Sequence, residues 1–213
     1  MTTPDFLSLT PLLIVASAPV IMMLTLTIAR NLKVIYGFSI CMFLAAFLSL
    51  FFIMPNVPHR IEPLLIIDNY GMLFLGMILS AGTLITILSY IYLSHQGGER
   101  EEYFIILFVA TLGASILVIA NHFITFFLGL ETLSISLYVM IAYLKHRDYS
   151  VEAGVKFLVI ASVATAFLLF GMALIYAATG SMSFGGIAEK ILSSGLSPLL
   201  LMGIGLMLVG IGF

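Results

Sequence analysis

The sequence has very little charge. Only 8% of its 213 residues are Asp, Glu, Lys or Arg, whereas hydrophobic residues make up 62% and the mean hydropathy is +1.23. A soluble domain is typically about a quarter charged, so a chain of this composition cannot cover itself with a wetted surface. The low charge excludes a water-soluble globular protein and predicts an integral membrane protein.

Cysteine and catalytic motifs are also scarce. The single Cys41 excludes an internal disulfide and any multi-cysteine metal site. The sequence has no glycine-rich phosphate loop, no paired metal-ligand histidines and no nucleophile beside a base, so we expect no catalytic residue, metal or cofactor in this chain. The net charge of −2 is spread over short loops without a basic run, which excludes nucleic acid as a partner.

Long apolar runs are what the sequence has instead. A transmembrane helix needs about 20 apolar residues, and runs near that length lie at residues 9–29, 34–54, 70–93, 103–120, 123–144, 151–179 and 199–213. The first run is interpreted as a retained helix, because MTTPDF before it lacks the charge of a signal peptide. We predict an all-α polytopic membrane helical bundle with about six complete transmembrane helices plus a truncated seventh.

The segments between the runs are mostly short. Only Asn121 and His122 separate the fourth run from the fifth, so we expect these two helices to form a tight antiparallel pair. Segment 56–71, with its prolines and charges, is predicted to be a loop. Segment 181–198 is also predicted to be a loop, with the option of lying along the membrane interface.

Lysine and arginine are distributed unevenly over the loops. Loops one, three and five contain Arg30, Lys33, Arg100, Lys145 and Arg147, whereas loops two, four and six contain only Arg60 and Lys190. Positively charged loops are retained on the cytoplasmic side. The bias predicts a multi-pass protein of the cytoplasmic (inner) membrane with its N-terminus outside.

One carboxylate, Glu131, lies in the middle of the fifth run. At about 1.5 Å per residue it is roughly 13 Å from His122, too deep to reach water by bending. An ionised carboxylate at this depth costs about 2.5 to 3.5 kcal/mol on insertion scales. Ser134 and Tyr138 share its helix face and extend a polar stripe. Glu131 is therefore interpreted either as a protonatable relay or as a hydrogen-bonded residue that joins helices.

Two further titratable side chains are candidates for proton transfer. Lys156 lies roughly 9 Å below the cytoplasmic edge of the sixth run. Glu152 precedes it by four residues, which favours an ion pair along one helix face and keeps a structural interpretation open. His122 lies in the turn before the fifth run, where it is either a proton entry point or a solvated turn histidine.

The stretch FLGLETLSISLYVMIAYLKHRDYSVEAGVKFLVIASVATAFLLFGMALIYAATGSMSF resembles the antiporter-like membrane subunits of respiratory complex I (NADH-quinone oxidoreductase), subunit N most of all. The similarity covers about residues 101–213, and the LGLE motif, the SLY step, the short basic loop and the FLLFGMALIY run carry it. Subunits of Na⁺/H⁺ antiporters and of membrane-bound hydrogenases share the general pattern.

The resemblance implies a proton-pumping module coupled to quinone reduction in other subunits. Glu131 matches the family's fifth-helix glutamate and Lys156 a sixth-helix lysine. Quinone, FMN and iron–sulfur clusters are expected elsewhere in the complex, none of them in this chain. The expected partners are other membrane subunits, the lipid bilayer and protons.

The resemblance also bears on how the chain is organised. Family members are longer, with a second inverted repeat and a further lysine in a broken seventh helix, so the chain is expected to be an N-terminal fragment. We predict one membrane domain over residues 1–213, with a three-helix part at 1–100 and the start of the first antiporter-like repeat at 101–213.

Two alternative functions stay open. In a Na⁺/H⁺ antiporter the carboxylate would alternate between sodium and a proton, and sodium would need further oxygen ligands from Thr132, Ser134 or Ser136. In a scaffold that only seals the membrane arm, Glu131 would be merely hydrogen-bonded.

Overall fold

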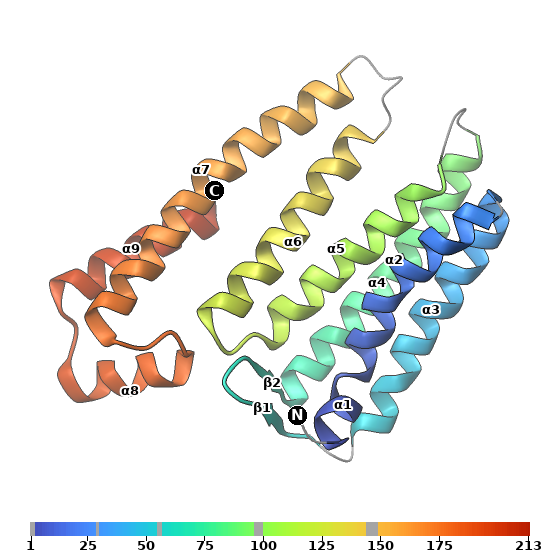
Figure 1. The fold of residues 1–213 in the computed structure, drawn as a ribbon. Helices are drawn as coiled ribbons and strands as arrows, with labels where there is room; N and C mark the ends of the chain where they lie inside the picture. Colours follow the sequence, from blue (N-terminus) through green and yellow to red (C-terminus); the bar gives the residue numbers. More distant parts are fainter. Residues whose placement is uncertain (1–2, 29, 55–56, 96–99, 144–148) are drawn as a thin grey trace.

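The computed structural model describes residues 3–28, 30–54, 57–95, 100–143 and 149–213, and helices dominate these ranges (Figure 1). In chain order the elements are α1 (Thr3–Ser8), α2 (Thr10–Ile28), α3 (Leu32–Ile53), β1 (His59–Ile61), β2 (Leu65–Ile67), α4 (Asn69–Ser94), α5 (Glu102–Ile119), α6 (Phe123–Ala142), α7 (Ser150–Thr179), α8 (Phe184–Ser194) and α9 (Pro198–Gly212).

Six of these helices, α2 to α7, are long and apolar enough to cross a membrane, and α9 is a shorter apolar helix. Their bounds lie within a few residues of the apolar runs, because the length of each span follows directly from the run of apolar side chains. The predicted fold class, a polytopic helical membrane protein, is confirmed.

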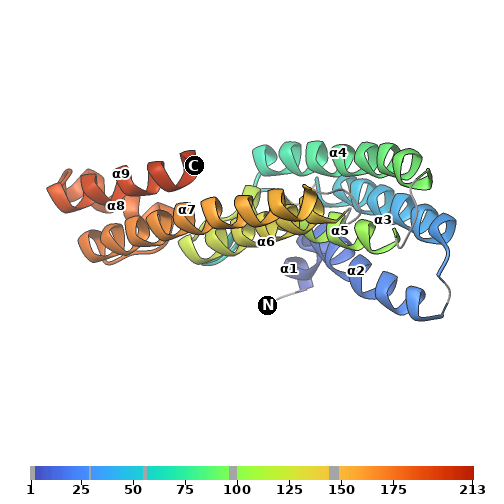
Figure 2. The same ribbon diagram turned by 90° about the horizontal axis from the view of Figure 1, so that it is seen from above.

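The helices form a row with a four-helix group at one end. Helix α2 packs against α3 and α5, and α4 packs against α3 and α5. Phe43 and Phe108 stack inside this group, with ring centroids 4.0 Å apart. Helix α6 lies between α5 and α7, and α9 packs on α7. Seen from above, α9 and α4 lie on the same side of the row that α7, α6 and α5 form (Figure 2).

Glycines set the closest helix contacts. A Cβ added at Gly113 of α5 would lie 2.5 Å from the Leu133 backbone nitrogen, and one at Gly129 of α6 would lie 2.9 Å from the Leu117 nitrogen. Because each glycine faces the backbone of the other helix, the two helices touch without intervening side chains. The predicted tight pair of the fourth and fifth runs is confirmed.

The prediction that segment 56–71 is simply a loop was wrong. From residue 57 onward it contains the antiparallel strands β1 and β2, in which Arg60 pairs with Ile66. The Asn121 backbone N–H donates to the Leu64 carbonyl over 2.9 Å, and Leu65 bridges to Ala120. The hairpin therefore lies across the turn between α5 and α6 and satisfies its backbone groups there.

The prediction of a loop for segment 181–198 was also wrong, because it contains α8. Ser183 caps this helix by accepting from the Gly186 N–H over 3.2 Å, and Gly195, with φ of 73°, ends it. Phe184, Ile187 and Ile191 pack toward the other helices, whereas Glu189 and Lys190 are exposed. Two glycines in its first turn and two serines in its last turn hid this short amphipathic helix from the sequence analysis.

Candidate functional site

The Glu131 carboxylate, midway along α6, lies where α6 faces α7. Glu131 is half-buried, and its Oε1 accepts a hydrogen bond from the Thr165 hydroxyl of α7 over 2.6 Å. The sequence predicted a hydrogen-bonded or exchangeable acid at this position but gave no partner on another helix. Thr165 is the residue of this candidate site that sequence reasoning missed.

Close packing against α5 on one side and α7 on the other holds α6 in place. Gly129, two residues before Glu131, touches the α5 backbone. Nearer the other end, a Cβ added at Gly154 of α7 would lie 3.2 Å from the Tyr138 carbonyl. The side chain of Glu131 is therefore presented by a helix whose backbone is held by both neighbours.

The polar stripe on α6 forms as its spacing predicts. A side-chain hydrogen bond joins Ser134 to Tyr138, and the charge of Glu131 acts on the Tyr138 hydroxyl. Tyr138 is buried, and its ring meets that of Phe157 on α7 edge-on at 5.2 Å. The stripe thus faces α7, as Glu131 does.

Lys156 lies near the start of α7 and does not share this interface. Its Nζ is 2.5 Å from the Glu152 carboxylate, and the two side chains are 72% and 53% exposed. The predicted pair along one helix face is present. Such an exposed pair contributes little to stability, and the role of Lys156 in proton transfer stays a prediction.

His122 caps α6. Its Nδ1 accepts from the Ile124 N–H over 3.2 Å, and the residue bridges to Ser183. The ring nitrogen thus serves a helix end, nine residues before Glu131, and a role in proton entry stays a prediction.

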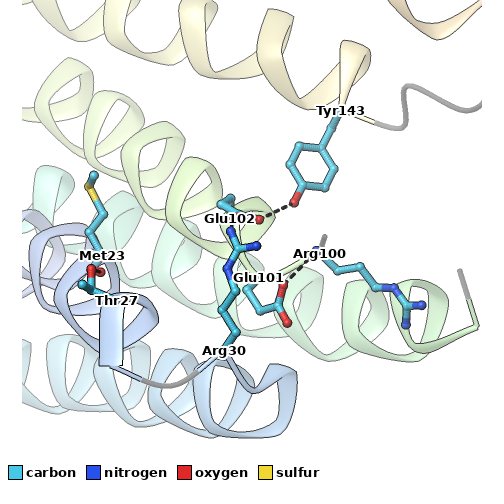
Figure 3. Close-up of polar contacts among 7 residues, drawn as sticks. All are labelled: Met23, Thr27, Arg30, Arg100, Glu101, Glu102 and Tyr143. Carbon is cyan, nitrogen blue, oxygen red and sulfur yellow. Dashed lines mark hydrogen bonds and ion pairs between the residues drawn. The ribbon is translucent and has the colours of Figure 1, made fainter. Parts of the chain in front are cut away.

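A second polar cluster, which the sequence did not indicate, lies at the opposite end of the helices (Figure 3). The Arg30 guanidinium pairs with the Glu102 carboxylate, and the Tyr143 hydroxyl donates to the other Glu102 oxygen over 3.3 Å. Burial raises the pKa of Tyr143 above its ordinary value, and the negative charge of Glu102 raises it further. The neutral tyrosine thus remains a donor.

This cluster joins residues from the ends of three different helices. Arg30 precedes α3, Glu102 begins α5 and Tyr143 caps α6. Lys145 and Arg147, which entered the prediction of orientation, lie outside the described residues. Within the described ranges no group of three or more His, Cys, Asp or Glu side chains is placed to hold a metal ion.

The geometry defines a multi-pass helical membrane protein with a half-buried acid between two of its spans. Residues 120–213 match the family described as NADH:quinone oxidoreductase/Mrp antiporter, transmembrane region. This matched part includes Glu131, Thr165 and Lys156.

Many solved structures are similar to the chain, and two of them are described here. A chain of respiratory complex I from Thermus thermophilus is 26% identical over 95% of this chain and 43% of its own length, with a TM-score of 0.79. A chain of the membrane-bound sulfane sulfur reductase, an archaeal respiratory membrane complex, is 23% identical over 100% of this chain and 44% of its own length, with a TM-score of 0.81.

The second match shows the fold alone, and the chain spans less than half the length of either protein. Together with the family match, the comparisons confirm the predicted resemblance to antiporter-like membrane subunits of the complex I type. Both similar chains belong to respiratory membrane complexes.

Proposed function

We propose that this chain belongs to a membrane subunit that carries protons across the cytoplasmic membrane in an NADH-quinone oxidoreductase. Glu131 takes up and releases the proton. The observation that carries the proposal is the position of this carboxylate, midway along α6 and hydrogen-bonded to a neighbouring span. Acids at such depth mark ion pathways more often than packing sites.

The nature of the hydrogen-bond partner supports exchange. Within the described part of the chain, Glu131 is bonded to a neutral hydroxyl and to no cation. A cation in contact would favour the ionised carboxylate strongly, whereas a hydroxyl is compatible with either form. Both protonation states of Glu131 thus stay accessible during turnover.

The proposal assigns the redox chemistry to other subunits. Quinone, FMN and iron–sulfur clusters are bound there, and the partners of this chain are membrane subunits of the same complex. Lys156 and His122 are proposed to assist proton movement near the two ends of the path, with Ser134, Tyr138 and Glu152 as supporting polar groups. The N-terminus is proposed to lie outside.

Glu131→Gln in the full-length assembled complex tests the proposal. Glutamine keeps an oxygen that Thr165 can donate to but cannot carry a proton, so proton translocation in inverted vesicles should fall to a small fraction of wild type while the complex still assembles. Glu189→Gln removes an exposed carboxylate of α8 and serves as the matched control. Undiminished pumping by Glu131→Gln would eliminate the relay role.

Sodium–proton exchange is the second candidate, because the matching family includes Mrp antiporters. Sodium binding at Glu131 would recruit the hydroxyl oxygens of Thr165 or Thr132. A sodium-dependent pH gradient in vesicles supplied with no quinone would favour this function over the first. A scaffold role predicts instead that Glu131→Gln impairs assembly and leaves pumping per assembled complex unchanged.

A further inference from the structure

We propose that Thr165 is a positioning residue that holds the Glu131 carboxyl group in both of its protonation states. The inference rests on the proposed function and extends it to a second helix. It assigns to α7 a defined part in each uptake and release of a proton.

The bonding of Thr165 differs from that of most other hydroxyls in the spans. A serine or threonine in a helix commonly donates to the carbonyl one turn earlier. The described residues that do so over four positions include Thr10, Thr25, Thr27, Ser39, Ser80, Thr83, Thr86, Thr111, Ser115, Thr132, Ser136, Ser162 and Thr179. Thr165 donates across to the carboxylate of α6 instead.

A hydroxyl can serve both forms of a carboxyl group, because it is a donor and an acceptor. With Glu131 ionised, the Thr165 O–H donates to Oε1, as observed. When Glu131 takes a proton from water, its new O–H donates to the Thr165 oxygen. The threonine hydrogen then leaves Oε1 by rotation about the Cβ–Oγ1 bond.

The backbone around Thr165 is braced from the other side by α9. A Cβ added at Gly210 would lie 2.8 Å from the Ala164 carbonyl and 2.7 Å from the Leu168 nitrogen. This contact fixes the turn of α7 that carries Thr165. The backbone that carries the Thr165 hydroxyl is therefore held in place.

Thr165→Val and Thr165→Ser in the full-length complex test the inference. Valine keeps the shape and loses the hydroxyl, so the ionised carboxylate loses its donor. The pH profile of proton translocation should move to higher pH by about one unit, a tenfold change in proton affinity. Serine should restore the wild-type profile. Thr83→Val is the matched control, because the half-buried Thr83 hydroxyl of α4 bonds to its own helix in the described contacts.

An infrared measurement gives a second, activity-independent readout. The carboxyl C=O band that Glu131→Gln removes should shift in Thr165→Val and return in Thr165→Ser. An unchanged band and an unchanged pH profile in Thr165→Val would overturn the inference, even where Glu131→Gln abolishes pumping and upholds the proposed function. If Glu131→Gln still pumps, the proposed function fails, and the band alone decides on Thr165. If the valine variant fails to assemble, Thr165→Ala takes its place under the same criteria.

Discussion

At the scale of single residues, the free-energy cost of a charge at Glu131 is similar in size to the contribution of its hydrogen bond to Thr165. An ionised carboxylate at mid-membrane costs about 2.5 to 3.5 kcal/mol, and a hydrogen bond to a charged group contributes about 1.5 to 3 kcal/mol. The two ranges overlap, so the Thr165 hydroxyl offsets most of the cost of a charge at Glu131.

Lys156→Met is expected to affect proton translocation less than Glu131→Gln does. Lys156 is largely exposed near the start of α7 and is paired with Glu152. Removing its charge leaves an exposed carboxylate that water can solvate, so assembly should be unaffected. Initial pumping rates of the two variants in the same vesicles check this. Equal severity would show that Lys156 acts directly on the path.

The sequence predicts contacts within a helix far better than contacts between helices. Ser134 and Tyr138 were placed beside Glu131 because the helical repeat fixes which residues share a face. Thr165 could not be found in this way, since its contact depends on how α7 is rotated against α6. The pairing of Arg30 with Glu102 likewise depends on which loops share an end.

At the scale of elements, the helices touch where glycines remove the side chains between them. Gly113 and Gly129 bring α5 and α6 into backbone contact, and Gly171 and Gly203 do the same for α7 and α9. The spans themselves were predictable from apolar runs, whereas α8 and the β1–β2 hairpin were not. These short elements gain their stability from the helix ends they cover, which a local pattern does not encode.

Gly113→Ala is expected to destabilise the pair α5–α6. Its new Cβ would lie 2.5 Å from a backbone nitrogen that cannot move aside as a flexible side chain can. Overpacking of this kind costs about 1 to 3 kcal/mol. Thermal unfolding of the purified complex measures the loss. Gly205→Ala, with nothing within 4 Å of the new Cβ, is the control and should unfold as wild type does.

Tyr143→Phe tests the cluster at the far end of α6. Loss of the hydrogen bond to Glu102 should lower stability by about 0.5 to 1.5 kcal/mol, and Tyr149→Phe, on a side chain 77% exposed, should not. Because its pKa is raised in the fold, the Tyr143 contribution is fully present below the unfolded value of 10.0 and is lost as the pH rises above it. The difference in thermal stability should therefore stay constant between about pH 6 and 9. A difference that vanishes within that range contradicts the assignment.

At the scale of the whole molecule, the two ends of the helices differ. The hairpin, the α5–α6 turn and α8 lie at one end, and the C-terminal ends of α2, α4 and α6 lie at the other (Figure 1). In the orientation proposed from the bias of Lys and Arg, the first end faces the outside of the cell.

Single cysteines in a Cys41→Ser background test this orientation. Glu189→Cys on α8 should react with a membrane-impermeant thiol reagent in intact cells, and Tyr149→Cys before α7 should react only in inverted vesicles. Both replace exposed side chains that carry no lysine or arginine charge. The reverse labelling pattern would invert the topology and leave the fold as it is.

Main-chain hydrogen bonds join the two-residue turn between α5 and α6 to the β1–β2 hairpin and to the segment that begins α8. The Asn121 N–H bonds to Leu64, the Asn121 carbonyl accepts from Phe184, and the Phe123 N–H donates to the Met182 carbonyl. At the other end of α6 the described contacts with Glu102 are made by side chains. The N-terminal end of α6 is therefore anchored by main-chain groups, so a substitution of the Asn121 side chain by any residue but proline leaves these three hydrogen bonds available.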